Sequence, residues 1–191
     1  MTETIDNLIS GDQALFLWLN GFNNSFWDPV MACITNKYTW IPIYLLLLIK
    51  IVRTYGRTGW IYFSAMVVAV LLADFITSGI MKPYFERPRP CHDPVIGHLV
   101  HQVTGCGGRF GFASSHASTS FAVITSLWLF TRHQLPWMKW LFIWPLIYSY
   151  SRIYVGVHYP GDILVGAIVG ILVALLIHKT LKINKFAKII A

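Results

Sequence analysis

The sequence has few charged residues. Asp, Glu, Lys and Arg make up 12% of the 191 residues, whereas hydrophobic residues make up 55%. Soluble domains carry roughly twice this charged fraction. The hydrophobic residues also gather into long runs, which the core of a soluble domain does not require. The composition therefore indicates a single membrane-embedded domain over 1–191 and argues against a soluble protein.

Acidic residues are scarce, with 8 Asp and Glu against 15 Lys and Arg. A basic balance indicates nucleic-acid binding only when the charge covers a soluble face. Here four lysines instead follow the last apolar run: Lys179, Lys182, Lys185 and Lys188. That position suits anionic lipid head groups, or an ordinary topology anchor. We therefore expect membrane lipids and no nucleic acid as partners, and the sequence is silent on oligomeric state.

Two further patterns are missing. The N-terminus carries Glu3, Asp6 and Asp12 where a cleavable signal peptide would be basic, so the first internal apolar span is expected to drive insertion. No sustained alternation of apolar and polar residues appears, which argues against a membrane barrel.

Long apolar runs predict an all-α, polytopic membrane helix bundle with five spans. The runs cover 38–53, 59–81, 115–131, 137–155 and 160–178. Each is close to the length that a helix needs to cross about 30 Å of hydrocarbon. The segment 11–35 is apolar but broken by Gly21 and Asp28-Pro29. We expect two short interfacial helices there, with a sixth, broken span as the alternative.

Lys and Arg are distributed unevenly between the two sides of this bundle. Nine would lie on the side of the C-terminal tail, and six on the other side: Lys37, Lys82, Arg87, Arg89, Arg109 and Arg152. The more basic side is expected to be cytoplasmic. The segments 82–114 and 151–162 then face the outside, and the C-terminus is cytoplasmic.

Three polar clusters lie at the expected outer ends of the spans. Lys82 and Arg89 belong to the first, Ser114 and Ser115 to the second, and Arg152 to the third. Ionisable side chains are costly near a membrane span and need a reason. Three cations that converge on the N-terminus of a helix, with its free N–H groups and hydroxyls, form a cradle for phosphate.

Two histidines complete this pattern. His158 and Asp162 are four residues apart, so they share one face if the turn is helical. A carboxylate on one ring nitrogen fixes the tautomer and raises the basicity of the other, which describes an activated nucleophile. His116, on another helix, is free to act as a general acid. Taken singly, such residues are more typical of a membrane interface, but three clusters on one side favour a site.

The three clusters resemble the signature of the type 2 phosphatidic acid phosphatase superfamily. The first part, Lys, six residues and Arg-Pro, is met by Lys82, Arg89 and Pro90. The second, Pro-Ser-Gly-His, is met at Ser114 and His116, while Ala113 replaces Pro and Ser115 replaces Gly. The third, Ser-Arg, five residues, His, three residues and Asp, is met in full by residues 151–162. The signature thus covers 82–162.

The resemblance implies a role for each matched residue. His158 would form a phosphohistidine, Asp162 would orient it, and His116 would protonate the leaving group. The phosphoryl oxygens would be held by Lys82, Arg89, Ser114 and Arg152, with the backbone amides of Ser115 and His116 helping. No metal or other cofactor would be required, because the cations provide the charge stabilisation.

Three further features lie near the clusters. Cys91 and Cys106 are expected to form a disulfide outside the membrane, with free thiols or a zinc site that uses nearby histidines as the alternatives. Asp74 is expected to be a buried carboxylate paired inside the bundle, or linked to Lys82 by a hydrogen-bond chain. Glu86 and Arg87 are expected to form a solvated loop pair, with a head-group contact as the alternative.

These observations predict a membrane phosphatase that hydrolyses a lipid phosphate or diphosphate at the outer face of a bacterial inner membrane. Undecaprenyl diphosphate is the preferred substrate, because an outward-facing site in a small chain suits recycling of that carrier. Phosphatidylglycerol phosphate, phosphatidic acid and a lipid A phosphate are alternatives, because the motifs read the phosphate and not the tail. Phosphotransfer to an alcohol would use the same residues. A non-enzymatic transporter would instead carry charges along a path through the bilayer.

Overall fold

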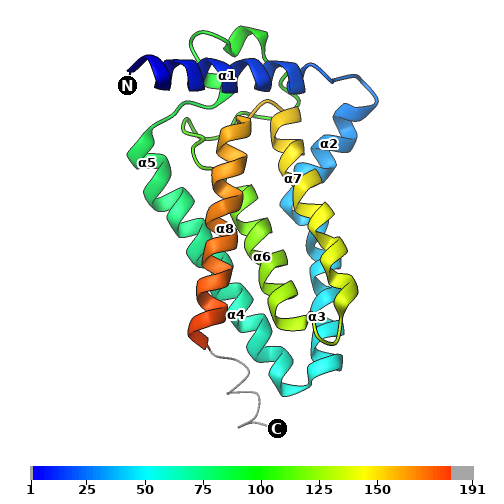
Figure 1. The fold of residues 1–191 in the computed structure, drawn as a ribbon. Coiled ribbons are helices and arrows are strands. Elements are labelled where there is room, and N and C mark those ends of the chain that lie inside the picture. The colour runs from blue at the N-terminus through cyan, green and yellow to red at the C-terminus, as the bar shows by residue number, and fades with distance from the viewer. Residues whose placement is uncertain (1, 182–191) are drawn as a thin grey trace.

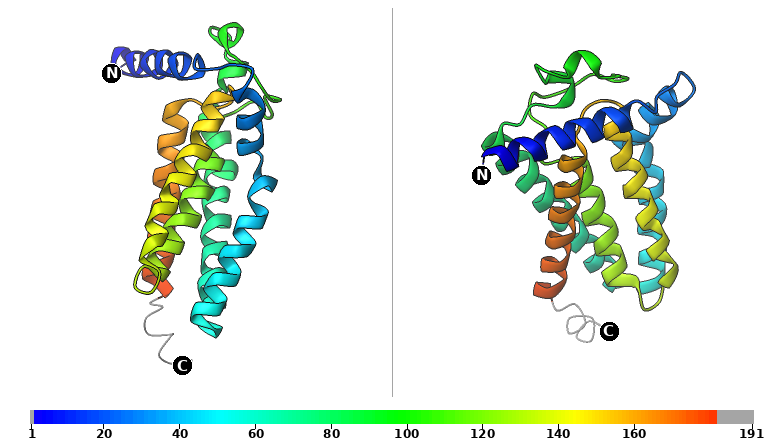
Figure 2. Two further views of the ribbon diagram at one scale, coloured as in Figure 1. Left: turned by 90° about the vertical axis from the view of Figure 1, so that its right-hand side faces the viewer. Right: turned by 45° about the horizontal axis from the view of Figure 1, so that its top comes forward.

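The computed structural model describes residues 2–181, which are built almost entirely from helices. The α-helices are α1 Thr2–Asn20, α2 Trp27–Thr35, α3 Ile41–Tyr55, α4 Arg57–Asp74, α5 Lys82–Phe85, α6 Ser115–Thr131, α7 Ile143–Tyr154 and α8 Pro160–Leu181. Shorter helical segments are η1 Lys37–Trp40, η2 Phe75–Met81, η3 Pro90–His92, η4 Gly97–Leu99 and η5 Pro136–Phe142. The longer helices run side by side, and α1 lies across their upper end (Figures 1 and 2).

Two helical stretches are long and apolar enough to cross a membrane. The stretch Arg57–Phe85 has 29 residues and a mean hydropathy of 2.0, and α8 has 22 residues and a mean hydropathy of 2.4. A third arises if Trp27–Thr35 and Lys37–Tyr55, which are bent by 71°, form one broken span. The all-α prediction is confirmed, but five spans are not. Helices α6 and α7 have 17 and 12 residues, so each is shorter than the two stretches above.

The N-terminal segment forms two helices, as expected, but the first is longer than the short interfacial helix that the sequence suggested. Helix α1 is a single helix of 19 residues that continues through Gly11, where a side chain would meet nothing within 4 Å. Leu8, Trp18 and Phe22 are exposed along or just beyond it. Helix α2 packs against α7, and Thr35 is its buried residue. Its sharp bend into η1 and α3 joins α2 to the run 38–53, so this bent pair is not the separate sixth span over 11–35 that was the alternative.

Helices α6 and α8 make the closest helix contact around the site. A Cβ added at Gly166 would collide with the carbonyl oxygen of Ser114, and one added at Gly170 would collide with that of Ser118. These two glycines, four residues apart, let the backbones approach as small residues do in membrane helix pairs. The Ser114 N–H also donates to the Asp162 carbonyl oxygen at 3.0 Å. The packing therefore fixes the first turn of α6 against the first turn of α8.

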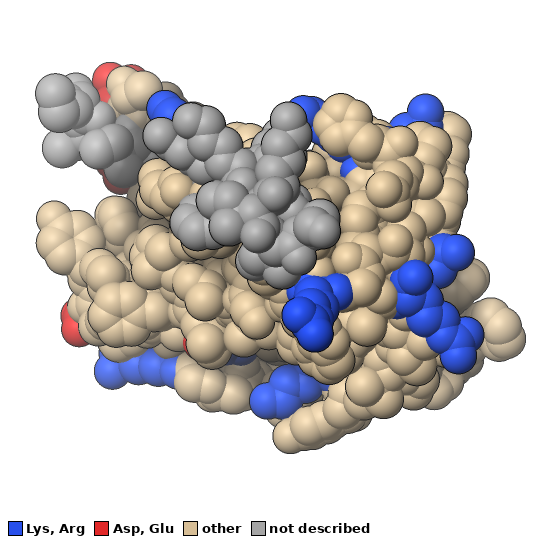
Figure 3. Space-filling view, turned by 90° about the horizontal axis from the view of Figure 1, so that it is seen from below, with Lys and Arg blue, Asp and Glu red and all other residues tan. Residues whose placement is uncertain are grey.

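The two ends of the bundle differ in charge. Basic residues lie where α3, α6 and α8 end and where α4 and α7 begin: Lys50, Arg53, Arg57, Arg132, Lys139 and Lys179. Figure 3 views this lower end and shows Lys and Arg side chains around it, with acidic groups confined to the edge of the view. The loop 86–114 and α1 lie at the opposite end (Figure 1).

Candidate active site

His158 lies in the turn between α7 and α8 and is 1% exposed. Its Nδ1 is 3.2 Å from Oδ2 of Asp162, which is fully buried. The backbone N–H of Tyr159 donates to the same Oδ2 at 3.0 Å. The chain places these groups together because Pro160 starts α8 directly after the turn, so that Asp162 falls in its first turn. A bond at Nδ1 fixes the tautomer that leaves Nε2 as the reactive nitrogen.

The surroundings of His158 keep it neutral. Burial, followed by the positive charges of Arg152 and Arg89, holds the pKa of this imidazole well below its usual value. Lys82 and Arg87 act in the same direction. A neutral imidazole is the nucleophilic form of histidine, so His158 can act chemically as a nucleophile beside a group of cations.

Lys82 is positioned by two hydroxyls. Its Nζ donates to Ser115 Oγ at 2.9 Å and to Ser78 Oγ at 3.4 Å. Ser78 Oγ in turn donates to Asp74 Oδ1 at 3.1 Å. This is the hydrogen-bond chain from Asp74 to Lys82 that the sequence suggested. Asp74 itself is exposed on the bundle surface, however, so the expectation of a buried carboxylate was wrong.

The two signature arginines are held by different elements. Arg89 donates from Nη1 to the carbonyl oxygen of Cys106 at 2.9 Å and from Nε to that of Phe110 at 3.3 Å. Arg152 donates from Nη1 to Thr35 Oγ1 on α2 at 2.7 Å. Among the described residues, its buried Nε has no hydrogen-bond partner. Arg152 therefore keeps donor capacity for an anion in the site.

The first turn of α6 supplies the remaining groups. Ser114 is the N-cap, and its Oγ accepts from the Ala117 N–H at 3.5 Å. The ring of His116 lies against Tyr148 of α7, with centroids 5.6 Å apart. Arg152, Lys82 and Arg89 lie close enough to His116 for their positive charges to interact electrostatically with its ring, and His158 also lies nearby. The structure thus brings the three sequence clusters together around one helix N-terminus.

Arg87 is a site residue that sequence reasoning missed. Its Nη1 donates to Asp162 Oδ1 at 3.0 Å, and its Nη2 donates to Asp12 Oδ2 at 2.7 Å. The expected pair with exposed Glu86 is therefore wrong, because two carboxylates, one from α1 and one from α8, bind the guanidinium instead. The sequence offered no signal for contacts that join residues 75 positions apart.

The loop 86–114 covers the site and is tied by a disulfide between Cys91 and Cys106. Among residues 2–181, no group of three or more His, Cys, Asp or Glu side chains is arranged to hold a metal ion. Gly111 of this loop lies close to His158 and Asp162, since an added Cβ would be 3.0 Å from Asp162 Oδ2 and 3.6 Å from His158 Nδ1. The loop therefore approaches His158 and Asp162 most closely at a residue without a side chain.

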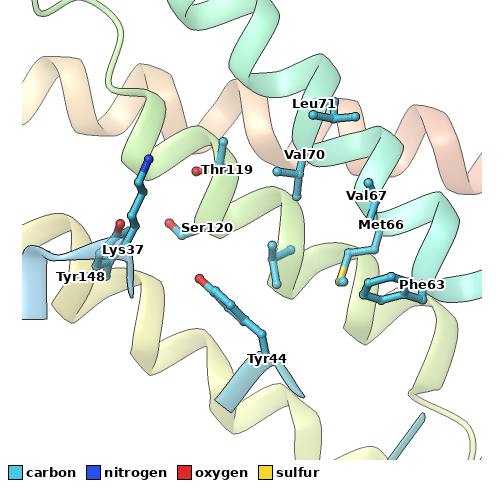
Figure 4. Close-up of a pocket in the computed structure, with 11 residues that line it drawn as sticks. Lys37, Tyr44, Phe63, Met66, Val67, Val70, Leu71, Thr119, Ser120 and Tyr148 are labelled. Atoms are coloured by element: carbon cyan, nitrogen blue, oxygen red, sulfur yellow. The ribbon is translucent and has the colours of Figure 1, made fainter. Parts of the chain in front are cut away.

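A cavity of about 340 Å³ lies beside the site between α3, α4, α6 and α7. Apolar side chains of α4, including Phe63, Met66 and Val70, line one side (Figure 4). Lys37 and Tyr148 lie on the other side, next to Ser120 of α6 (Figure 4). Because the ring of Tyr148 also contacts His116, one side chain separates the cavity from the polar cluster.

Curated relatives match most of the chain. It is 34% identical over 170 residues to a lipid A 4'-phosphatase of Bacteroides thetaiotaomicron, covering 87% of this chain and 75% of the relative. It is 32% identical to a lipid A 4'-phosphatase of Porphyromonas gingivalis, covering 92% and 75%. It is also 31% identical to undecaprenyl-diphosphatase BcrC of Bacillus subtilis, covering 82% and 76%.

Solved structures share the fold. Aquifex aeolicus LpxE superposes with a TM-score of 0.67 at 24% identity, covering 87% of this chain and 93% of that one. A PAP2 type phosphatidylglycerolphosphate phosphatase from Bacillus subtilis superposes with a TM-score of 0.65 at 22% identity, covering 91% and 86%.

Residues 58–186 match the family model described as the PAP2 superfamily, and this range includes every residue of the signature. The chain therefore belongs to the PAP2 superfamily and is a membrane-embedded phosphoric ester hydrolase.

Proposed function

We propose that this protein is a metal-independent lipid phosphatase that works through a phosphohistidine at His158. The observation that carries the proposal is a buried, neutral His158 bonded to Asp162 and surrounded by the charges of Lys82, Arg89 and Arg152. An anion would offset these cations, and a phosphate monoester brings its negative charge to the nucleophile. Arg152, with a buried donor free of protein partners among the described residues, supports this assignment.

The reaction would proceed in two steps. In the first, Nε2 of His158 attacks phosphorus, the bond from phosphorus to the lipid oxygen breaks, and His116 gives that oxygen a proton. In the second, His116 takes a proton from water, the water oxygen attacks phosphorus, and the phosphorus–nitrogen bond breaks to release phosphate. Lys82, Arg89, Arg152, Ser114 and the first N–H groups of α6 would hold the phosphoryl oxygens throughout.

Lipid A phosphate is the substrate that we place first. The two relatives of highest identity reported above are both named lipid A 4'-phosphatases, and each match covers more than four fifths of this chain. Undecaprenyl diphosphate, which the sequence alone favoured, becomes the second candidate on the match to BcrC. The cavity lined by α4 supports a lipid in either case, because its apolar wall lies one side chain from His116 and suits a hydrocarbon chain.

The distribution of charge supports an outward-facing site. The basic residues at the lower end of the bundle favour a cytoplasmic location for that end. His158, Asp162 and the disulfide-bonded loop would then face the opposite side of a bacterial inner membrane. A disulfide suits an oxidising exterior, which agrees with this orientation.

Phosphate release from a lipid panel tests the proposal. Purified protein in detergent with chelator would be given lipid A, undecaprenyl diphosphate, phosphatidylglycerol phosphate and phosphatidic acid, with and without an alcohol acceptor. We expect chelator-resistant release that His158→Ala abolishes. His98→Ala, at an exposed histidine of the outer loop, is the matched control and should retain wild-type activity.

Each alternative result has a distinct meaning. Release that survives His158→Ala would contradict the nucleophile assignment. Phosphate that appears on the added alcohol, with little free phosphate, would identify a phosphotransferase. The lipid with the highest kcat/KM would identify the substrate class.

A further inference from the structure

Helix α1 lies against the turn that carries His158. Asn20 donates from Nδ2 to the carbonyl oxygens of Ile153 at 3.1 Å and Tyr154 at 2.8 Å. The ring of Phe16, which is fully buried, packs edge-on against Tyr159 with centroids 5.4 Å apart. These positions share one face of α1 with Asp12, because they are spaced four residues apart. The opposite side of the helix carries Trp18, which is exposed.

Asp12 connects this helix to the catalytic carboxylate. Its Oδ1 accepts from the backbone N–H of Gly161 in the first turn of α8 at 2.8 Å. Its Oδ2 accepts from Arg87 Nη2 at 2.7 Å, and Arg87 Nη1 donates to Asp162 Oδ1 at 3.0 Å. Asp12 therefore holds the chain beside Asp162 directly and holds Asp162 itself through Arg87.

The Arg87 guanidinium is fixed on three sides. It bridges the two carboxylates and also lies over the ring of Tyr159, with its Cζ 4.0 Å from the centroid. The Tyr159 hydroxyl donates to Asp93 Oδ2 at 2.7 Å, which holds the ring in place. Neither Arg87 nor Asp12 is strongly exposed, since their side chains are 22% and 17% accessible. A planar fork bound in this way retains a single orientation.

This arrangement assigns each oxygen of Asp162 a separate partner. Arg87 occupies Oδ1, whereas Oδ2 faces His158 Nδ1 and the Tyr159 N–H. An Arg87 without Asp12 would place its whole charge on Asp162 and weaken the bond to His158. Asp12 shares that charge, so Asp162 can stabilise the positive charge that develops on the imidazole during attack.

We propose that Asp12 and Arg87 form a positioning pair, supplied partly by α1, that orients Asp162 and thereby His158. This inference rests on the proposed role of His158 as nucleophile. Asp12 also lies outside the residues 58–186 that match the family model, so the pair adds an element that the signature does not contain. Neither side chain belongs to the phosphate cradle, and the pair should therefore act on turnover rather than on binding.

Asp12→Asn is the central variant, with Asp6→Asn as its matched control. Both remove one negative charge from α1, but Asp6 is exposed on that helix. With lipid A, or the lipid of the panel that wild type hydrolyses fastest, we expect Asp12→Asn to lower kcat roughly tenfold or more, because a small misplacement of a catalytic group is costly. The KM and the inhibition constant of orthovanadate, a phosphate analogue, should change less than about twofold. Asp12→Glu should recover most of the activity.

A double-mutant cycle with Arg87→Gln separates positioning from general destabilisation. If the two residues act as a unit, Asp12→Asn combined with Arg87→Gln should lose little more kcat than the worse single variant. Thermal unfolding of each detergent-solubilised variant identifies any that fails to fold, and Asp12→Glu then carries the comparison.

The outcomes distinguish this inference from the proposed function. Loss of activity in His158→Ala with wild-type kcat in Asp12→Asn would overturn the positioning pair alone. A higher KM with unchanged kcat would place Asp12 and Arg87 in substrate binding and would also overturn it. Activity that survives His158→Ala would overturn the nucleophile assignment instead.

Discussion

Lys82 Nζ lies 2.9 Å from Ser115 Oγ, a bond that joins the end of the long helical stretch through α4 to the first turn of α6. The superfamily signature has glycine at the position of Ser115. In this chain a hydroxyl therefore orients Lys82, the first cation of the proposed phosphate cradle. One turn further along, Ser118 Oγ lies 3.1 Å from Thr77 Oγ1 and joins the same helices.

Ser115→Gly should weaken phosphate binding more than turnover. A hydrogen bond to a charged partner contributes about 1.5 kcal/mol or more, so KM and the inhibition constant of orthovanadate should rise roughly tenfold. Ser64→Ala, at an exposed serine on α4, should leave both constants unchanged. Wild-type binding in Ser115→Gly would show that Lys82 does not depend on this hydroxyl.

The pH dependence should reflect the neutral imidazole of His158. Because burial and Arg152 lower the pKa of this group, His158 stays neutral and nucleophilic below its ordinary pKa of about 6.5. The acid limb of kcat/KM should therefore lie below pH 6.5, as the profile of wild type would show. A limb at or above that value would contradict a depressed pKa for the nucleophile.

The same lowered pKa affects stability with a definite sign. In the unfolded chain His158 takes up a proton near pH 6.5, whereas in the folded chain it does not, so its contribution is fully present above that pH. Stability should decrease as the pH falls from about 6.5 toward the folded pKa. The decrease should be smaller in His158→Asn than in wild type when Tm is followed against pH.

Removal of the disulfide should affect both the loop and Arg89. Cys91 and Cys106 are 15 residues apart, and a bridge over a loop of this length contributes about 3 kcal/mol. Because the Cys106 carbonyl accepts from Arg89, Cys91→Ser with Cys106→Ser should lower Tm and also raise KM. Cys33→Ser, at an exposed free cysteine, is the control. An unchanged KM would show that Arg89 keeps its position without the bridge.

The packing of α6 on α8 gives a prediction for stability. Gly170→Ala would press a methyl group against the Ser118 carbonyl and should destabilise the protein by about 1–3 kcal/mol. Gly11→Ala is the matched control, since its Cβ would meet nothing within 4 Å within helix α1. Alanine there should be neutral or stabilising by about 0.5–1 kcal/mol. Thermal unfolding of both variants in one detergent checks the contrast.

Much of the helical framework could be predicted from the sequence. The apolar run 115–131 coincides with α6, and the runs at 59–81 and 160–178 lie within the two long stretches. These segments could be predicted because the length of a hydrophobic run is a local property of the sequence. The five spans are not confirmed, because a run of apolar residues does not reveal where a helix begins after a turn, as happens at η5 before α7.

The signature residues could be recognised in the sequence for a different reason. Charged residues near a span are costly, and the spacing between His158 and Asp162 corresponds to one helical turn. The contacts of Arg87 with Asp12 and Asp162 could not be predicted from the sequence, because they depend on how α1 lies across the bundle. Asp74 was assigned to the interior because periodicity is weak in a helix that is apolar on all sides.

The bond from the Gly161 N–H to Asp12 joins residues 149 positions apart. Every described helix from α2 to α7 lies between them along the chain. This contact can form only after those helices have been synthesised, and closing so long a loop carries an entropic cost. A nascent chain that still lacks α8 would therefore have neither Asp162 nor the Gly161 N–H that bonds to Asp12.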